Sequence, residues 1–130
     1  MKNLAVKKNS YCVFILLVLF VSACKKEAGT GGKKTISGTV YYLNGATNSL
    51  EIANGAKVMI CYGTKSASTN YDQTILADAD GKYHIDGLRK GDYFITAEFT
   101  DTNGFTYTTA GYGVTAENKK DDLSLDINLK

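Results

Sequence analysis

From Thr35 to the end of the chain, the sequence is a series of short runs in which apolar and polar residues alternate, and turn dipeptides separate these runs. The last run is the most regular, because leucine or isoleucine stands at every second position from Leu123 to Leu129. Alternation with a period of two places the apolar side chains of a strand on one face. No part of this region carries the period of an amphipathic helix. We therefore predict an all-β fold.

The turn dipeptides divide this region into predicted strands. Asn44-Gly45, Asn54-Gly55, Asp80-Gly81 and Asn103-Gly104 all contain residues that tolerate positive φ. Around them we expect seven strands, at residues 35–42, 56–62, 74–77, 83–86, 92–100, 105–110 and 123–129, with Asp80-Gly81 closing a hairpin. Since one-faced sheets must pair to bury their apolar faces, we predict a sandwich of two sheets.

The start of the chain resembles a bacterial lipoprotein signal. A basic segment precedes an uninterrupted apolar stretch from Tyr11 to Val21, and the small pair Ser22-Ala23 leads directly into Cys24. At about 11 residues the apolar stretch is too short to span a bilayer, which takes about 20. The alternatives are a buried core helix or an ordinary secretory signal. The stretch lacks the polar positions of an amphipathic helix, and an ordinary signal does not require a cysteine at this point.

The resemblance implies cleavage before Cys24 and a diacylglycerol on its thiol. Residues 1–23 are then the signal peptide, residues 24–34 a Gly-rich flexible tether with a reach of roughly 16 to 19 Å, and residues 35–130 the folded domain. Acyl chains contribute about 0.8 kcal/mol per buried CH₂, so we expect the protein to be held on a membrane through Cys24. The expected location is the cell envelope, at the periplasmic or the surface face of the outer membrane.

The charge of the domain argues against nucleic acid as a partner. Residues 35–130 contain 8 basic and 12 acidic residues, a net charge of −4. Proteins that bind nucleic acid carry a basic surface that neutralises phosphates, and this domain has the opposite balance.

Four motifs in order resemble the carboxypeptidase regulatory-like domain. They are Ser37-Gly38-Thr39-Val40, Asn54-Gly55-Ala56-Lys57-Val58, Asp78-Ala79-Asp80-Gly81-Lys82-Tyr83 and Gly87-Leu88-Arg89-Lys90-Gly91-Asp92-Tyr93. The resemblance implies a seven-stranded, transthyretin-like Greek-key sandwich, in a family of modules that are generally non-catalytic and are appended to carboxypeptidases, outer-membrane receptors and surface proteins. One departure from the family is a missing proline. It often precedes the Gly-Ala-x-Val strand in the family, and Ser49-Leu50-Glu51-Ile52 occupies that region here.

Histidine and cysteine, which commonly support catalysis or metal binding, are sparse, whereas the numerous carboxylates show no pair that can be told from solvated surface. The single histidine, His84, alternates with apolar neighbours and is expected to face solvent, and no Gly-x-Ser-x-Gly motif is present. Cys61 lies in an apolar run and is expected to be a buried, unreactive thiol. Asp78 and Asp80 are weak candidates for calcium, which prefers six to eight oxygen ligands, and two carboxylates are too few. We expect no enzyme activity, metal or cofactor.

Tyrosines are the candidate binding residues. Tyr41, Tyr71 and Tyr112 are the first choices, and Tyr112 stands out because Gly111 and Gly113 flank it in a predicted loop. A flat aromatic ring can stack on a sugar, but tyrosine also packs in cores and across strands. The absence of tryptophan, the largest stacking platform, weakens the case for a glycan.

Two functions follow from these features. The favoured hypothesis is a non-catalytic, lipid-anchored accessory module that docks protein partners in the envelope. The alternative is a small glycan-binding surface lipoprotein. An exposed apolar patch would support protein docking, whereas exposed aromatic rings gathered at one place would support glycan binding.

Overall fold

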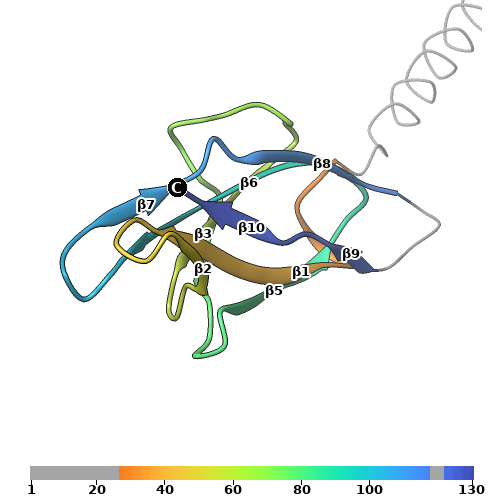
Figure 1. Cartoon of the computed structure of the whole chain (residues 1–130). Coiled ribbons are helices and arrows are strands. Elements are labelled where there is room, and N and C mark those ends of the chain that lie inside the picture. Colours follow the sequence, from red (N-terminus) through yellow and green to blue (C-terminus); the bar gives the residue numbers. More distant parts are fainter. Residues whose placement is uncertain (1–26, 118–121) are drawn as a thin grey trace, which may run out of the picture.

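The computed structural model describes residues 27–117 and 122–130, and every regular element in this part of the chain is a β-strand (Figure 1). The strands form two sheets that share one apolar core, which confirms the predicted all-β sandwich. The strands are β1 (Thr30–Asn44), β2 (Ser49–Ile52), β3 (Lys57–Tyr62), β4 (Gln73–Leu76), β5 (Lys82–Leu88), β6 (Gly91–Thr100), β7 (Thr106–Thr108), β8 (Tyr112–Ala116), β9 (Asp122–Ser124) and β10 (Ile127–Leu129).

The first sheet is built around β1, which has 15 residues. Along one edge, β1 pairs antiparallel with β5 and, nearer its C-terminal end, with β2. Along the other edge, β1 pairs parallel with β9 and then with β10. β1 thus runs the length of the sheet and joins its two ends.

The second sheet is built around β6. β3 pairs antiparallel with one edge of β6, and β4 pairs with the free edge of β3. β8 and β7 share the other edge of β6, β8 pairing with residues 91–95 and β7 with residues 98–100. At one corner the sheets meet, since Thr108 and Lys130 exchange backbone hydrogen bonds of 3.1 and 2.9 Å.

The predicted count of seven strands is wrong, because the described residues form ten. The ten occupy seven positions, three of which are divided between two strands. The run 123–129, predicted as one strand, is divided into β9 and β10 at Leu125 and Asp126. There the chain crosses so close to Gly38 that a Cβ on this glycine would lie 1.8 Å from the Leu125 oxygen.

The turn at Asp80-Gly81 does not close a hairpin, contrary to the prediction. β4 pairs with β3 in the second sheet and β5 pairs with β1 in the first, so the turn carries the chain between sheets. The turn chemistry itself is as expected: Gly81 has a φ of 72°, and the Asp78 carboxylate accepts hydrogen bonds of 2.9 Å from the backbone N–H groups of Asp80 and Lys82.

The first strand begins at Thr30 rather than at Thr35, so part of the segment expected as a tether lies in the sandwich. The Gly29 N–H donates to the hydroxyl of buried Tyr93 at 2.9 Å, and the Arg89 N–H donates to the Gly29 carbonyl at 2.7 Å. Ala28 packs against the core. A Gly-rich composition indicated flexibility, but these backbone bonds depend on residues about 60 positions away and are not visible in the local sequence.

The core lies between the inner faces of the two sheets, and its largest fully buried side chains include Tyr93, Ile36, Ile60, Ile85, Leu88, Ile95, Ile127 and Leu129. Strand β6 is buried on both faces, however, so burial does not alternate along it as predicted. Phe94 and Thr96 on its outer face are buried as well, and so is the neighbouring Cys61, as predicted for this thiol. The loops after β3 and β7 cover this face, since Cys61 Sγ contacts the Asn70 carbonyl and Thr96 Oγ1 contacts the Thr109 carbonyl.

No helix in the described residues has the length and apolarity needed to cross a membrane.

Candidate binding site at the hairpin end of the sandwich

Three segments that are distant in the sequence meet at one end of the sandwich. They are the turn between β1 and β2, the turn between β6 and β7, and the C-terminal end of β10 (Figure 1). Each turn is held by an acceptor side chain. Asn44 Oδ1 accepts hydrogen bonds from the N–H groups of Ala46 and Thr47, and Asp101 Oδ1 accepts from those of Asn103 and Phe105.

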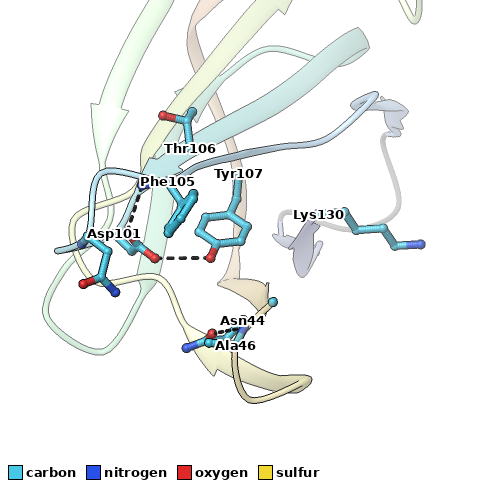
Figure 2. A pocket seen from close by; sticks show the side chains of 9 residues that line it. Asn44, Ala46, Asp101, Phe105, Thr106, Tyr107 and Lys130 are labelled. Carbon is cyan, nitrogen blue, oxygen red and sulfur yellow. Dashed lines mark hydrogen bonds between the residues drawn. The ribbon is translucent and has the colours of Figure 1, made fainter.

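Between these segments lies a hollow of about 500 Å³, which we call the end hollow. This volume is within the range typical of small-ligand sites. Its lining consists of aromatic, amide and charged residues from all three segments: Asn44, Gly45, Ala46, Asp101, Asn103, Phe105, Thr106, Tyr107 and Lys130. Figure 2 shows Phe105 and Tyr107 on one side, Asn44 and Ala46 on the hairpin below them, and Lys130 beyond.

Phe105 is the exposed apolar group of the end hollow. The residue is 65% exposed, although phenylalanine is usually buried. Its backbone N–H is held by Asp101 at 2.9 Å, which fixes the turn that carries the ring. The ring is therefore a solvent-facing apolar surface on an ordered turn.

Tyr107 is held from two directions. Its hydroxyl donates to Asp101 Oδ2 at 3.2 Å (Figure 2), and its ring lies 4.8 Å from that of Tyr42 between centroids. Tyr42 in turn lies 4.7 Å from Phe99 and donates its hydroxyl to Glu51 Oε2 at 2.7 Å. These contacts continue the core to the wall of the hollow, so the aromatic wall is rigid before any ligand arrives.

Hydrogen bonding and burial set the charges near the hollow. The Tyr42 hydroxyl, followed by the bonds from Thr47, Asn44 and Ser49, holds the pKa of Glu51 below its ordinary value. Burial, and then the hydrogen bond to Asp101, raise the pKa of Tyr107. The Glu51 carboxylate is thus ionised and the Tyr107 phenol neutral near pH 7. The end hollow combines an apolar ring with amide and carboxylate acceptors.

A second hollow, of about 430 Å³, lies beside the first and shares Lys130 with it. Its lining is polar and comes from Thr108, Thr109, Ala110, Tyr112, Asn128 and Lys130. Tyr112, predicted to lie on an exposed loop, instead begins β8 and is half-buried, with its hydroxyl accepting a hydrogen bond from the Asn128 N–H at 3.3 Å. We call this the side hollow.

The other two predicted tyrosines lie elsewhere. Tyr41 is on the outer face of the first sheet, and Tyr71 is in the loop before β4 and is 38% exposed. The three tyrosines come from three separate surfaces, so they do not form one aromatic platform. Their roles as binding residues stay predictions.

The candidate residues Asp78, Asp80 and His84 lie in a turn or face solvent. Asp78 holds the turn between the sheets, and Asp80 is exposed beside it. In residues 27–117 and 122–130, no three His, Cys, Asp or Glu side chains gather in a way that could hold a metal ion. His84 faces solvent as expected, with Nε2 3.3 Å from Asp86 Oδ2. Cys24 lies outside the described residues.

The outer face of the β1–β2 hairpin is apolar. Tyr41 stands opposite Ile52, and Leu43 opposite Leu50, all on the side away from the core. Leu50 is 57% exposed and Ile52 is 48% exposed. We call these four residues the hairpin apolar face. Sequence reasoning did not predict it, because Ser49–Ile52 was not recognised as a strand.

The residues of the end hollow were also missed by sequence reasoning. Both turns were recognised from Asn44-Gly45 and Asn103-Gly104. The available signal was Phe105, a large apolar residue directly after a turn, where exposure is expected. That two turns almost 60 residues apart share one end is a property of the sheet pairing.

No protein-family model and no curated protein sequence matches the chain. Its structure is similar to that of a proposed carbohydrate binding protein from Pseudomonas aeruginosa, with a TM-score of 0.50, 16% identity, and coverage of 82% of this chain and 93% of that one. It is also similar to a variant of BcpA, the major pilin subunit of Bacillus cereus, with a TM-score of 0.50, 16% identity, and coverage of 75% of this chain and 30% of the pilin. At such identity these likenesses concern the fold alone.

Proposed function

We propose that this protein is a non-catalytic, lipid-anchored module of the bacterial cell envelope and that its end hollow binds carbohydrate. The observation that carries the proposal is the exposed ring of Phe105, which stands on an ordered turn within a rim of amide and carboxylate groups. We place carbohydrate binding first on the ring of Phe105 alone, since the three predicted tyrosines lie on separate surfaces, and we keep protein docking at the hairpin apolar face as the second candidate.

The chemistry of a sugar suits this arrangement. One face of a pyranose ring presents C–H groups, which pack on an aromatic ring, while its hydroxyls extend sideways as donors and acceptors. Phe105 offers the ring, and the Asn103 side chain offers donors and an acceptor nearby. The Asn44 amide lines the hollow but is already bonded, with Oδ1 accepting from the turn N–H groups and Nδ2 donating to Glu51 Oε1 at 3.0 Å. Small-molecule sites generally combine apolar lining with a few polar groups that set orientation.

The direction of β1 adds an argument about display. The strand begins beside Gly29 at one end of the sandwich and ends at Asn44 beside the end hollow (Figure 1). Thr30 and Lys34 both stand opposite Leu88, so the extended part of the strand runs from Lys34 to Asn44 and spans about 33 Å at 3.3 Å per residue. With a lipid on Cys24, only a few residues would separate the membrane from Ala28. The end hollow would then face away from the membrane, toward glycans outside it.

Two likenesses are consistent with a binding module. The solved structure from Pseudomonas aeruginosa is described as a proposed carbohydrate binding protein. The four motifs in the sequence resemble the carboxypeptidase regulatory-like domain, whose members are generally non-catalytic. Both point to recognition rather than to turnover, and neither identifies a ligand.

Glycan binding is tested with the full chain in mild detergent, screened against an array of bacterial and host glycans and then titrated calorimetrically. We expect Phe105→Ala to weaken binding at least about fivefold, since one stacking contact contributes about 1 kcal/mol. Leu76→Ala is the matched control, because Leu76 is similarly exposed at 70% and lies outside the hollow. An array without hits, or equal effects of the two substitutions, would overturn the proposal.

The anchor is tested separately, by mass spectrometry of the native protein from cells. We expect the first residue of the mature chain to be Cys24 carrying acyl groups, and Cys24→Ser to release the protein from the membrane fraction. An intact amino-terminal methionine, or an unmodified thiol at Cys24, would refute the lipid anchor and with it the proposed location.

A second candidate function, docking of an envelope protein, is favoured by the hairpin apolar face. Three of its four residues, Leu43, Leu50 and Ile52, are exposed and lie in adjacent cross-strand pairs, and such clusters commonly mark contacts between proteins. Crosslinking in cells tests it: a specific partner should be lost with Leu50→Lys and retained with Leu76→Lys. Unchanged crosslinks in both variants would argue against this surface.

A further inference from the structure

The end hollow and the side hollow share a boundary. Lys130 lines both, and its backbone exchanges hydrogen bonds with Thr108 at 3.1 and 2.9 Å. Strand β7 borders both hollows in turn, since Thr106 and Tyr107 line the first and Thr108 lines the second. The hydrogen-bonded pair of Thr108, at the end of β7, and Lys130, directly after β10, therefore lies at the boundary between the two hollows, and we call this boundary the ridge.

The two hollows differ in chemistry in a way that suits successive parts of one ligand. The end hollow has the aromatic surface of Phe105, while the side hollow offers hydroxyl and amide groups from Thr108, Thr109 and Asn128. The Asn128 side chain is exposed in β10, and its backbone N–H is already used by the Tyr112 hydroxyl. The side hollow therefore suits a ligand with many hydroxyls and without a large apolar face.

The volumes of the two hollows indicate how long a ligand must be to occupy both. Each hollow, at about 500 and 430 Å³, lies within the range of a complete small-ligand site. A monosaccharide in the end hollow is separated from Asn128 by the ridge at Lys130. A chain of linked sugars can lie over the ridge and use the polar groups on both sides.

We infer that the ligand is an oligosaccharide that lies across both hollows, with one sugar on Phe105 and a later unit in the side hollow. This inference rests on the proposed function and adds a minimum length to the ligand. Affinity should rise when the sugar chain becomes long enough to cross the ridge, because the added unit makes new hydrogen bonds without a second loss of translational freedom.

The test uses the full chain in detergent and calorimetric titration with linear series from the monosaccharide to the hexasaccharide. The probes are β-1,4-linked glucose, α-1,4-linked glucose and β-1,4-linked N-acetylglucosamine. We expect at least one series to bind, with an increase in affinity of about fivefold or more between two successive lengths, the value of roughly one additional hydrogen bond.

Two substitutions distinguish the hollows. Asn128→Ala should weaken the hexasaccharide about fivefold and leave the shortest binding sugar unchanged, whereas Phe105→Ala should weaken every length. Ser124→Ala is the control for Asn128→Ala, since Ser124 is an exposed polar residue on the preceding strand, outside both hollows.

The outcomes separate this inference from the proposed function. Binding that depends on Phe105 but is independent of chain length and of Asn128 overturns the two-hollow ligand and leaves carbohydrate binding standing. Failure of all three series, together with an array without hits, overturns both.

Discussion

Gly38 lies where the chain between β9 and β10 crosses β1 at backbone distance. A Cβ at this position would lie 1.8 Å from the Leu125 oxygen and 2.5 Å from its carbonyl carbon. An ordinary carbon to oxygen contact is about 3.3 Å, so Gly38→Ala must move Leu125 by about 1.5 Å. The atoms that a Cβ would meet belong to the backbone of Leu125, so rotation of a side chain cannot relieve the clash.

The displacement acts on three hydrogen bonds. They are Leu125 N–H to the Ser37 carbonyl at 2.8 Å, Thr39 N–H to Asp126 Oδ1 at 2.8 Å, and the Tyr83 hydroxyl to the Leu125 carbonyl at 2.6 Å. At about 1 kcal/mol each, their loss destabilises the fold by about 3 kcal/mol. Restriction of the unfolded chain by alanine offsets about 0.4 to 1 kcal/mol. The expected net loss is about 2 kcal/mol, a large share of a typical 5 to 15 kcal/mol.

Urea denaturation of residues 27–130, followed by far-ultraviolet circular dichroism, measures this loss. We expect the midpoint to fall by about 1 M or more with an unchanged slope. Gly45→Ala is the control, because a Cβ there meets nothing within 4 Å, and its unfolding free energy should stay within about 0.5 kcal/mol of the parent. Equal midpoints for the two variants would show that the close crossing at Gly38 does not constrain the fold.

Three further outcomes are expected from the same protein. Tyr83→Phe keeps the buried ring but leaves the Leu125 carbonyl without its hydroxyl donor. The unfolding free energy, measured by urea denaturation, should therefore fall by about 1 to 2 kcal/mol. A midpoint equal to that of the parent would contradict this. The pKa of Glu51 in the folded state lies below its ordinary value of about 4.5, so its contribution to stability is present above that value and is lost as the pH falls through the folded pKa. The melting temperature of Glu51→Gln should therefore fall less steeply than that of the parent below about pH 4.5, and superimposable profiles would refute the role of its hydrogen bonds. Burial raises the pKa of the Cys61 thiol, so Cys61 should react slowly in the folded protein. Peptide mapping should find it unalkylated by iodoacetamide in the native protein and fully alkylated in concentrated urea. Rapid alkylation of the native protein would contradict this and would mean that the loop over Cys61 opens.

Local patterns predicted the elements of the fold better than their partners. The runs 56–62 and 92–100 became β3 and β6 with small changes at the ends, because alternation and flanking turns are encoded within each segment. The pairing of β4 with β3 and of β5 with β1 was missed, since a turn such as Asp80-Gly81 has the same chemistry within a hairpin and between sheets. The order within residues 28–34 was missed as well, because it depends on Arg89 and Tyr93.

The candidate site shows the same division. Asn44, Asp101 and Phe105 belong to turns that the sequence marks, and their individual chemistry is readable from residue type. Tyr112 lines the side hollow, but its flanking glycines suggested a loop where the chain forms β8. The hollows arise only when β1, β6 and β10 bring the ends of these elements together.

The sequence by itself determined that this chain forms strands with one apolar face and that such strands must be stacked in two layers, because periodicity and turn residues act over a few neighbouring positions. Only the tertiary structure decided which strands are neighbours, where the last strand is interrupted, and which turns share an end. These features depend on hydrogen bonds and steric contacts between residues far apart in the chain, such as Gly38 with Leu125 and Thr108 with Lys130, and no local pattern contains them.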